Sequence, residues 1–276
     1  MKKLALLAVP AIFALVVVGS VGARSQATTI RIAAAMNSGD ERPAPSGDVA
    51  NARGAFAATL TKTDTGATLT WTLTFSNLSG PATAAHIHIA ERGTPGPVVV
   101  PLCAPCTSGV TGTANINATV LAAIQSDRAY VNVHTRQNPA GEIRDQVSPV
   151  AATGATLTAA KERPKPKGNV KRARGTFTAT VKKEGTEGVI TWRLTFSRLT
   201  GKGIAAHIHR GAPGKAGPVI VPLCAPCRSG ARGQARVSAS VLNALETGRA
   251  YVNVHTRRNQ AGEIRGQLRA VPLTVS

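Results

Sequence analysis

Histidine is the residue type in this chain whose placement most suggests chemistry. The chain holds six histidines, in two sets with identical spacing: His86, His88 and His134, then His207, His209 and His255. Alternate residues of a β-strand share a face about 6–7 Å apart, so each His-x-His pair would lie side by side. Imidazole binds copper, zinc, nickel and iron, and three histidines with an open position form a catalytic geometry. The interpretation we prefer from the sequence is a polar sheet face whose histidines hydrogen-bond to one another, to the backbone and to water. The alternative is a copper or zinc site in each half of the chain.

The four cysteines also occur in pairs, in the motif Cys-Ala-Pro-Cys at 103–106 and 224–227. Four cysteines allow three connectivities. In an oxidising compartment we expect the local bridges Cys103–Cys106 and Cys224–Cys227. One alternative is a redox pair, but that chemistry needs a helix starting at the first cysteine, and Thr107-Ser108-Gly109 predicts a loop. The other alternative is a zinc site built from His86, His88, Cys103 and Cys106.

A third repeated motif is Gly-Glu-Ile-Arg, at 141–144 and 262–265. If it lies on a strand, Glu142 and Arg144 share a face and could pair with each other or with the histidines. One acid per repeat does not suit glycoside hydrolysis, which needs two placed carboxylates. The sequence contains no Gly-x-Ser-x-Gly elbow and no phosphate-binding loop. We therefore expect no enzyme activity, with a redox metalloenzyme as the remaining catalytic alternative.

The segments that position these residues form an internal repeat of the sequence. Shifting the sequence by 121 positions aligns residues 41–147 with 162–268 without a gap, with about 60% identity. Trp71 falls on Trp192 and Tyr130 on Tyr251. Each copy has the length of an ordinary domain, which predicts two tandem domains over 28–148 and 149–276. Residues 148–156 form a joint that is too short for a flexible linker and merges with the first strand of the second copy.

Within each copy the hydrophobic residues alternate with polar ones. Trp71, Leu73 and Phe75 alternate with threonines, as do the apolar residues of 56–60, which predicts strands with one buried face. Further strands are expected over 30–36, 84–90, 97–102, 110–117, 129–135 and 142–147, with a hairpin turn at 138–141 and a short helix over 120–125. Many short strands predict an all-β fold: two tandem antiparallel sandwich domains, immunoglobulin-like or barrel-like.

The N-terminal segment predicts export. Lys2 and Lys3 precede an apolar run from Leu4 to Val18, and small residues follow to Ala23. This is the pattern of a signal peptide over residues 1–27 with cleavage near Ala23; the alternative is an uncleaved anchor. We expect a secreted, periplasmic or cell-surface protein with no membrane span after cleavage. Nucleic acid is then not an expected partner, although the net charge is +20.

Of the two copies, only the second carries a net positive charge. Residues 28–148 hold eight basic and eight acidic side chains, whereas residues 149–276 hold 22 basic and 5 acidic ones. The densest stretch predicts an anion-binding surface formed by Lys161, Arg163, Lys165, Lys167, Lys171, Arg172 and Arg174. Its expected partner is an anionic cell-envelope polymer or an extracellular protein. The alternative is a solvated face that keeps the protein soluble.

Four motifs together resemble a known family. These are Ala-His-Ile-His at 85–88, Gly-Pro-Val-Val-Val-Pro-Leu at 96–102, Tyr-Val-Asn-Val-His-Thr at 130–135 and Asn-Pro-Ala-Gly-Glu-Ile-Arg at 138–144. The chain is similar to the CHRD domain in both copies, except that Gln260 replaces the turn proline. The resemblance implies an extracytoplasmic β-sandwich, and we expect a non-enzymatic binding or structural protein. The His-x-His strand is also similar to that of Cu/Zn superoxide dismutase, whose further histidine and aspartate ligands each copy lacks.

Overall fold

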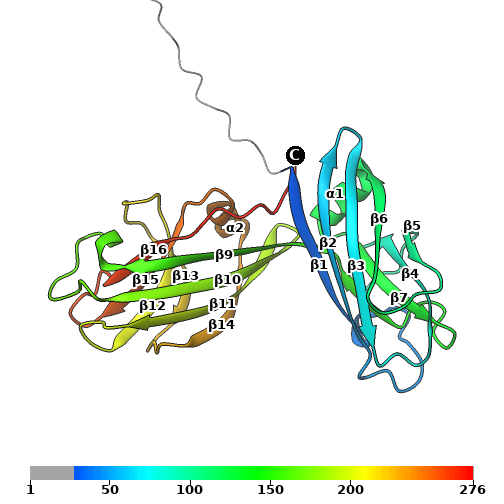
Figure 1. Ribbon diagram of the computed structural model, residues 1–276, viewed down its shortest axis with the longest axis horizontal. Helices are drawn as coiled ribbons and strands as arrows, with labels where there is room; N and C mark the ends of the chain where they lie inside the picture. Colours follow the sequence, from blue (N-terminus) through cyan, green and yellow to red (C-terminus); the bar gives the residue numbers. More distant parts are fainter. Residues whose placement is uncertain (1–27, 276) are drawn as a thin grey trace, which may run out of the picture.

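The computed structural model describes residues 28–275, and the predicted signal segment 1–27 lies outside the described residues. Two β-rich modules stand side by side in Figure 1. We call residues 28–147 the first module and residues 148–275 the second module. No helix within 28–275 is long and apolar enough to span a membrane.

The two modules repeat the same order of elements. The first consists of β1 (Thr29–Asn37), η1 (Ser38–Asp40), β2 (Arg53–Thr63), β3 (Gly66–Ser76), β4 (Ala82–Ile89), β5 (Val98–Cys103), β6 (Val110–Asn117), α1 (Ala118–Gln125), β7 (Ala129–Thr135) and β8 (Ile143–Gln146). The second consists of β9 (Ser148–Thr158), η2 (Ala159–Lys161), β10 (Arg174–Glu184), β11 (Glu187–Ser197), β12 (Gly203–Arg210), β13 (Val219–Cys224), β14 (Ala231–Val237), α2 (Ala239–Glu246), β15 (Ala250–Thr256) and β16 (Ile264–Gln267).

Each module is an antiparallel sandwich, which confirms the predicted all-β fold. In the first, one layer has the order β1-β2-β3-β6 and the other β5-β4-β7-β8, and β1 touches β8 at the corner. Leu69, Trp71 and Leu73 of β3 are buried between the layers, and the intervening threonines are exposed. The predicted alternation is therefore the alternation between core and solvent.

A short helix covers part of each core. In α1 the residues Val120, Leu121, Ala123 and Ile124 are buried, and the side chain of Asn117 caps the helix by accepting from the Val120 N–H. The helix begins two residues before the predicted 120–125 and ends at the predicted residue. Helix α2 occupies the same place in the second module.

The joint between the modules is a shared strand. The start of β9 pairs with β1, with Arg31 opposite Val150 and Ala33 opposite Ser148, and the rest of β9 pairs with β10. One sheet therefore runs through both modules, as Figure 1 shows for β9. The sequence predicted that the joint merges with a strand, but not that this strand pairs with the first module.

The C-terminal end of the chain also returns to the first module. Val275 packs in the core of that module, and its N–H donates to Gln125 Oε1 at 3.1 Å. Between the modules, the carboxylate of the buried Asp145 forms two ion pairs. Its oxygens lie 3.0 Å from an Arg92 nitrogen and 3.5 Å from the Lys182 nitrogen of the second module. These contacts make the two modules structurally dependent on each other.

Candidate metal centres

The histidines of each predicted triad come from two neighbouring strands. His86 and His88 lie on β4, and His134 lies on β7, its antiparallel neighbour. In the register, His86 is opposite Asn132, and His88 is opposite Tyr130. All these side chains share the face of the sheet that looks away from the apolar core, because Val131 and Val133 occupy the core face. The second module repeats the arrangement on β12 and β15.

The ring nitrogens of each triad converge. One ligand atom from each of the three histidines lies within 4.8 Å of the others, in both modules. His86 Nδ1 lies 3.1 Å from His134 Nε2, and the equivalent atoms of His207 and His255 lie 3.0 Å apart. A tetrahedral zinc ion with bonds near 2.0–2.1 Å holds its nitrogen ligands about 3.3 Å apart. The triads are thus close to the spacing that an ion needs.

Backbone carbonyls fix the tautomer of two histidines in each triad. His88 Nδ1 lies 2.8 Å from the carbonyl oxygen of Gly96, and His134 Nδ1 lies 3.0 Å from that of Pro139. A carbonyl only accepts, so both Nδ1 atoms carry the proton and both Nε2 atoms present a lone pair. Metal-binding histidines are held in this way, with the second nitrogen donating to the backbone.

The second module makes the same two contacts. His209 Nδ1 donates to Gly217 at 2.9 Å, and His255 Nδ1 donates to Gln260 at 2.8 Å. The departure from the CHRD pattern at Gln260 therefore leaves the support of His255 intact, because the contact uses the backbone and not the side chain.

One buried nitrogen in each triad lacks a partner. Among the described residues, Nε2 of His88 and of His209 has no hydrogen-bond partner at normal distance and angle; the neighbouring Asn132 and Asn253 act on these imidazoles but leave their own Oδ1 atoms unpaired as well. The two histidines are only 7% and 8% exposed. A buried polar atom without a partner costs about 1–3 kcal/mol. A metal ion bound at the lone pair would supply the missing interaction.

Burial also keeps the histidines neutral. Desolvation lowers the pKa of all six below the ordinary value, to about 4 for His134 and His207. In the first triad, the histidine neighbours lower the pKa of His86 and His134 further. Neutral imidazole is the form that binds metals, so the triads hold their ligand form at neutral pH.

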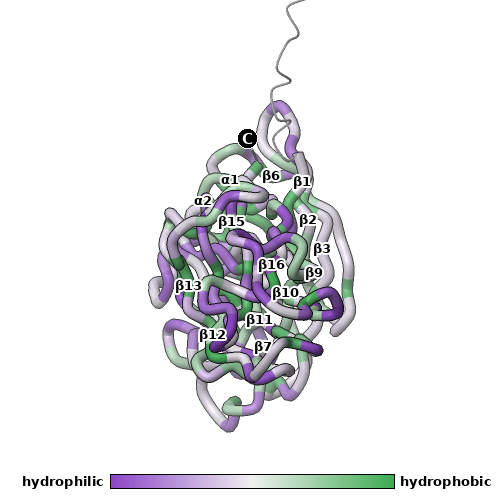
Figure 2. The backbone as a smooth tube through the Cα atoms, turned by 90° about the vertical axis from the view of Figure 1, so that its left-hand side faces the viewer, coloured by the Kyte–Doolittle hydropathy of each residue, from purple (hydrophilic) through white to green (hydrophobic). Residues whose placement is uncertain are grey.

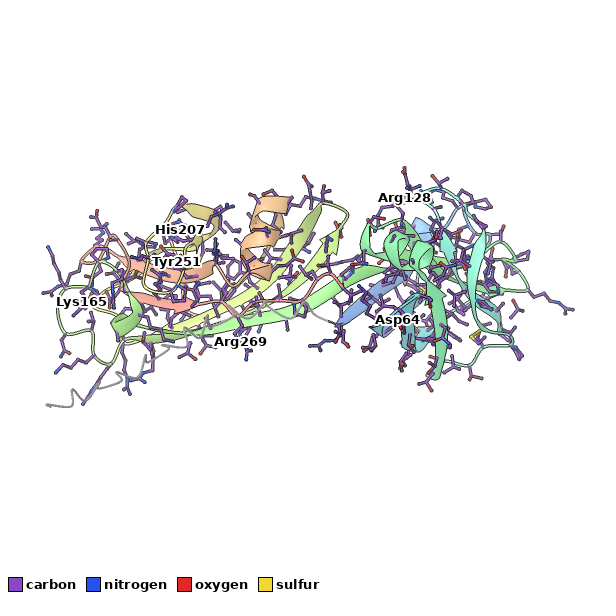
Figure 3. All side chains as sticks on the ribbon, turned by 90° about the horizontal axis from the view of Figure 1, so that it is seen from above. Asp64, Arg128, Lys165, His207, Tyr251 and Arg269 are labelled. Carbon is purple, nitrogen blue, oxygen red and sulfur yellow. A yellow bond between two sulfur atoms is a disulfide. The ribbon has the colours of Figure 1, made fainter. Side chains whose placement is uncertain are left out.

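Sequence reasoning missed the stack behind each triad. The Tyr130 ring lies flat on His88, with centroids 4.7 Å apart and planes 8° apart. The buried guanidinium of Arg144 lies 3.3 Å from the Tyr130 centroid and donates to the carbonyls of Glu91 and Thr94. His209, Tyr251 and Arg265 repeat the stack. Figure 3 labels His207 of the triad and Tyr251 of the stack in the second module.

A buried acid lies beside this stack, and it was also missed. Glu41 is 1% exposed, and burial raises its pKa to about 7 against the lowering effects of the Arg42 N–H and of Arg144. The side chain of Asn132 interacts with both Glu41 and His88. It lowers the pKa of Glu41 and raises the pKa of His88. The signal in the sequence was Glu-Arg-Pro at 41–43, which is unchanged at 162–164.

The expected pairing of Glu142 with Arg144 or with the histidines is not found. Strand β8 begins at Ile143, so Glu142 lies in the turn and points elsewhere. Its carboxylate accepts from Ser79, Thr135 and Asn138. Burial raises the pKa of Glu142, but these hydrogen bonds outweigh burial and lower it below its ordinary value. Glu142 therefore ties the β7–β8 turn to the loop after β3.

The cysteines form the two expected local disulfides, Cys103–Cys106 and Cys224–Cys227. The alternative zinc site with His86 and His88 is therefore wrong, because bonded sulfur offers no thiolate. Residues 104–109 contain no helix, as predicted, so the structure lacks the helix start that the redox alternative requires.

Four of the predicted anion-binding residues surround one cavity. Arg163, Lys165, Lys171 and Arg174 line a hollow of about 770 Å³ over the loop after η2. Lys161, Lys167 and Arg172 belong to the same segment but do not line it. Within residues 28–275, the side chains of Lys165 and Lys171 have neither an ion pair nor a hydrogen bond. Figure 3 places Lys165 at the end of the second module that is remote from the first.

Comparison with known proteins agrees with this architecture. The family model of the CHRD domain matches residues 32–147 and again residues 153–268. Neither the curated proteins nor the solved structures give a match. The two matches cover well over half of the chain and contain both triads, both disulfides and both stacks. The chain therefore belongs to the CHRD domain family, with two copies of the domain in tandem.

Proposed function

We propose that this is a secreted, non-enzymatic binding protein in which each CHRD module holds one copper or zinc ion on its histidine triad. The observation that carries the proposal is the orphaned lone pair of His88 Nε2, repeated at His209, within reach of two further imidazoles. The disulfides and the predicted signal peptide support secretion, because both belong to an oxidising route.

The triad is suited to a bound ion with an open position. His86 and His207 are partly exposed, so each site is reachable from solvent. Three neutral nitrogens leave the fourth position of a tetrahedral ion for water or a partner group. In such a site His86 Nδ1 would exchange its proton for the metal and move the proton to Nε2. Copper is favoured over zinc by nitrogen donors at equal availability.

The test is titration of the mature protein with Cu(II) and with Zn(II). We expect two ions per chain at low micromolar metal, measured by calorimetry and by elemental analysis after dialysis. The variant His86→Ala/His207→Ala should bind neither. Arg136→Ala/Arg257→Ala is a matched control, because these residues occupy equivalent positions outside the triads. Binding that is unchanged in the histidine variant would reject the proposal.

A second candidate function is docking of the second module on an anionic cell-envelope polymer. It rests on the hollow lined by Arg163, Lys165, Lys171 and Arg174. The first copy has Ala44, Ser46 and Ala50 where the second has Lys165, Lys167 and Lys171. The fold thus does not need these three lysines, which supports a role in binding, whereas Arg163 and Arg174 correspond to Arg42 and Arg53 of the first copy.

Docking is tested on the full chain, because β9 and Val275 tie the two modules together. The variant Lys165→Ala/Lys167→Ser/Lys171→Ala carries the residues of the first copy. We expect it to elute from an anionic polysaccharide matrix at lower salt than the wild type, with the same metal content. Elution at the same salt would reject docking through this segment and leave the metal proposal untouched.

A further inference from the structure

A second hollow of the second module lies beside its disulfide. It has a volume of about 750 Å³ and lies between the loop joining β11 to β12 and the loop after β13. Its apolar lining includes Phe196, Leu199 and Pro226, and its charged lining consists of Arg198, Lys202 and Arg228. None of the triad histidines lines it, and neither do the residues of the basic 161–174 segment.

The three cations of this hollow are not neutralised by the protein. In the described part of the chain, no carboxylate pairs with Arg198, Lys202 or Arg228, and their side chains make no hydrogen bond. All three residues are exposed. Three unpaired positive charges around one concave surface repel one another and attract an anion.

The first module shows that the charges were added to an unchanged framework. The 121-residue shift places Phe196 on Phe75, Leu199 on Leu78 and Pro226 on Pro105. The cations, by contrast, fall on uncharged residues: Asn77, Pro81 and Thr107. Every difference among these six positions introduces a positive charge, and all three charges border the same hollow.

The framework holds the two loops in place. The Phe196 N–H donates to Ser229 Oγ at 2.8 Å, and the Gly230 N–H donates to the Leu194 carbonyl at 2.9 Å. The Cys227 N–H donates to the Gly203 carbonyl at 3.2 Å, and Cys227 is bonded to Cys224. Ser108 binds Phe75 in the same way in the first module. Binding would therefore cost little ordering of the backbone.

We propose that this hollow binds an organic oxyanion, a phosphate or sulfate ester. The planar guanidinium groups of Arg198 and Arg228 match tetrahedral oxyanions through paired N–H donors, and Lys202 adds a point charge. The carbon body of the ester would rest on Phe196, Leu199 and Pro226. The site is independent of both functions proposed above, although it lies near the basic segment, since Ser197 pairs with Arg174.

The probes are 4-nitrophenyl phosphate, 4-nitrophenyl sulfate and the uncharged 4-nitrophenyl glucoside, titrated into the full chain. We expect both esters, or one of the two, to bind and the glucoside not to bind. The variant Arg198→Asn/Lys202→Pro/Arg228→Thr carries the residues of the first module, which folds with them. Loss of its three charge-assisted contacts should weaken ester binding by about 100-fold.

The reciprocal variant Asn77→Arg/Pro81→Lys/Thr107→Arg should create ester binding in the first module. The variant of the 161–174 lysines should bind the esters like the wild type. The proposal is overturned if neither ester binds, if the glucoside binds equally well, or if the Arg198 variant keeps full affinity. It is also overturned if the lysine variant loses all ester binding. Far-UV circular dichroism serves as the readout for folding, and it keeps this test separate from that of the triads.

Discussion

The two modules keep the same polar site but differ in the charge of their surfaces. The triad, the tyrosine stacked on it and the arginine behind the tyrosine are superposable in type and spacing, with Tyr130–Arg144 and Tyr251–Arg265 both at 3.3 Å. The buried acids Glu41 and Glu162 also correspond. By contrast, the surface of the first module is neutral and that of the second is strongly basic. The charge of the surface therefore differs between the modules while the site is the same.

Part of the difference lies in the loops at one end of the second module, and part lies on its strands, as at Lys182, Arg193 and Arg232. Figure 2 looks onto this end, where the loops between the strands are largely hydrophilic. The strands beneath them keep the register of the first module, since β4 pairs with β7 as β12 pairs with β15. Loops tolerate substitution because few contacts depend on their side chains. The comparison teaches that one fold can keep a duplicated histidine site while the charge of only one of its modules changes.

The largest effect should follow from removing one triad at a time. His88→Ala should leave one of the two metal equivalents, His209→Ala should leave the other, and the double variant should bind none. Each histidine supplies a ligand that no described neighbour replaces. Elemental analysis and calorimetric stoichiometry measure this effect. If His88→Ala abolished both equivalents, the two modules would share one site and the comparison would fail.

The buried glutamate should give the next largest effect, through pH. The pKa of Glu41 is raised to about 7 because of burial, so ionisation of this carboxyl destabilises the folded state as the pH rises from about 4.5 to 7. Glu41→Gln removes that cost. Relative to the wild type, the variant should gain about 2–3 kcal/mol in unfolding free energy between pH 5 and pH 8. Urea unfolding at the two pH values measures the gain.

Two further variants test the sign of this effect. Glu162→Gln should also gain unfolding free energy relative to the wild type as the pH rises, because burial also raises the pKa of Glu162. Glu142→Gln should instead lose unfolding free energy relative to the wild type as the pH rises, since hydrogen bonds hold the pKa of Glu142 below its ordinary value. Its charged form stabilises the fold above pH 4.5, and that contribution disappears as the pH falls through the folded pKa. A Glu41→Gln difference that is constant with pH would contradict the buried state of the acid.

The sequence predicted what depends on local periodicity. The strand over 110–117 and that over 129–135 match β6 and β7 residue for residue, because alternating side chains specify a strand with an apolar and a polar face. Strand β6 is half-buried, whereas β7 is buried on both faces. The meeting of His134 with His86 also followed, once the two strands were assumed to be neighbours. The disulfides followed from the three-residue spacing and the expected oxidising compartment.

What the sequence could not predict depends on contacts between distant residues. Glu41 reaches Asn132 across 91 positions, and no local pattern marks an acid as buried. The pairing of β1 with β9 is equally hidden, because either strand presents a usable edge to any partner. Glu142 was expected on the strand that begins one residue later, and this offset turned its side chain toward Ser79 instead of Arg144.

A smaller effect is expected from moving charge between the modules. The variant Ala44→Lys/Ser46→Lys/Ala50→Lys gives the first module the lysines of the second. Each lysine near an anionic surface contributes up to about 1 kcal/mol, so the total gain should be about 2 kcal/mol. The variant should elute from an anionic matrix at higher salt than the wild type, with the same metal stoichiometry. Elution at unchanged salt would mean that the shape of the hollow lined by Lys165 and Lys171, and not charge alone, determines docking.

The smallest effect concerns the tyrosine that supports each triad. The Gly96 N–H donates to Tyr130 Oη at 3.1 Å, and the Gly217 N–H donates to Tyr251 Oη at 3.2 Å. Tyr130→Phe removes this hydrogen bond but keeps the ring on His88, so it should cost about 1 kcal/mol of unfolding free energy. Metal stoichiometry should stay at two, because the Gly96 carbonyl still accepts from His88.

Tyr251→Phe should lose the same unfolding free energy, since the stack and the loop contact are equivalent in the second module. The pair of variants separates two roles of the tyrosine. Support of the loop requires the hydroxyl, whereas packing against the imidazole requires only the ring. Loss of metal from either phenylalanine variant would place the phenol oxygen among the ligands. That result would contradict a site built from three imidazoles, because the hydroxyl here is already engaged by the glycine N–H.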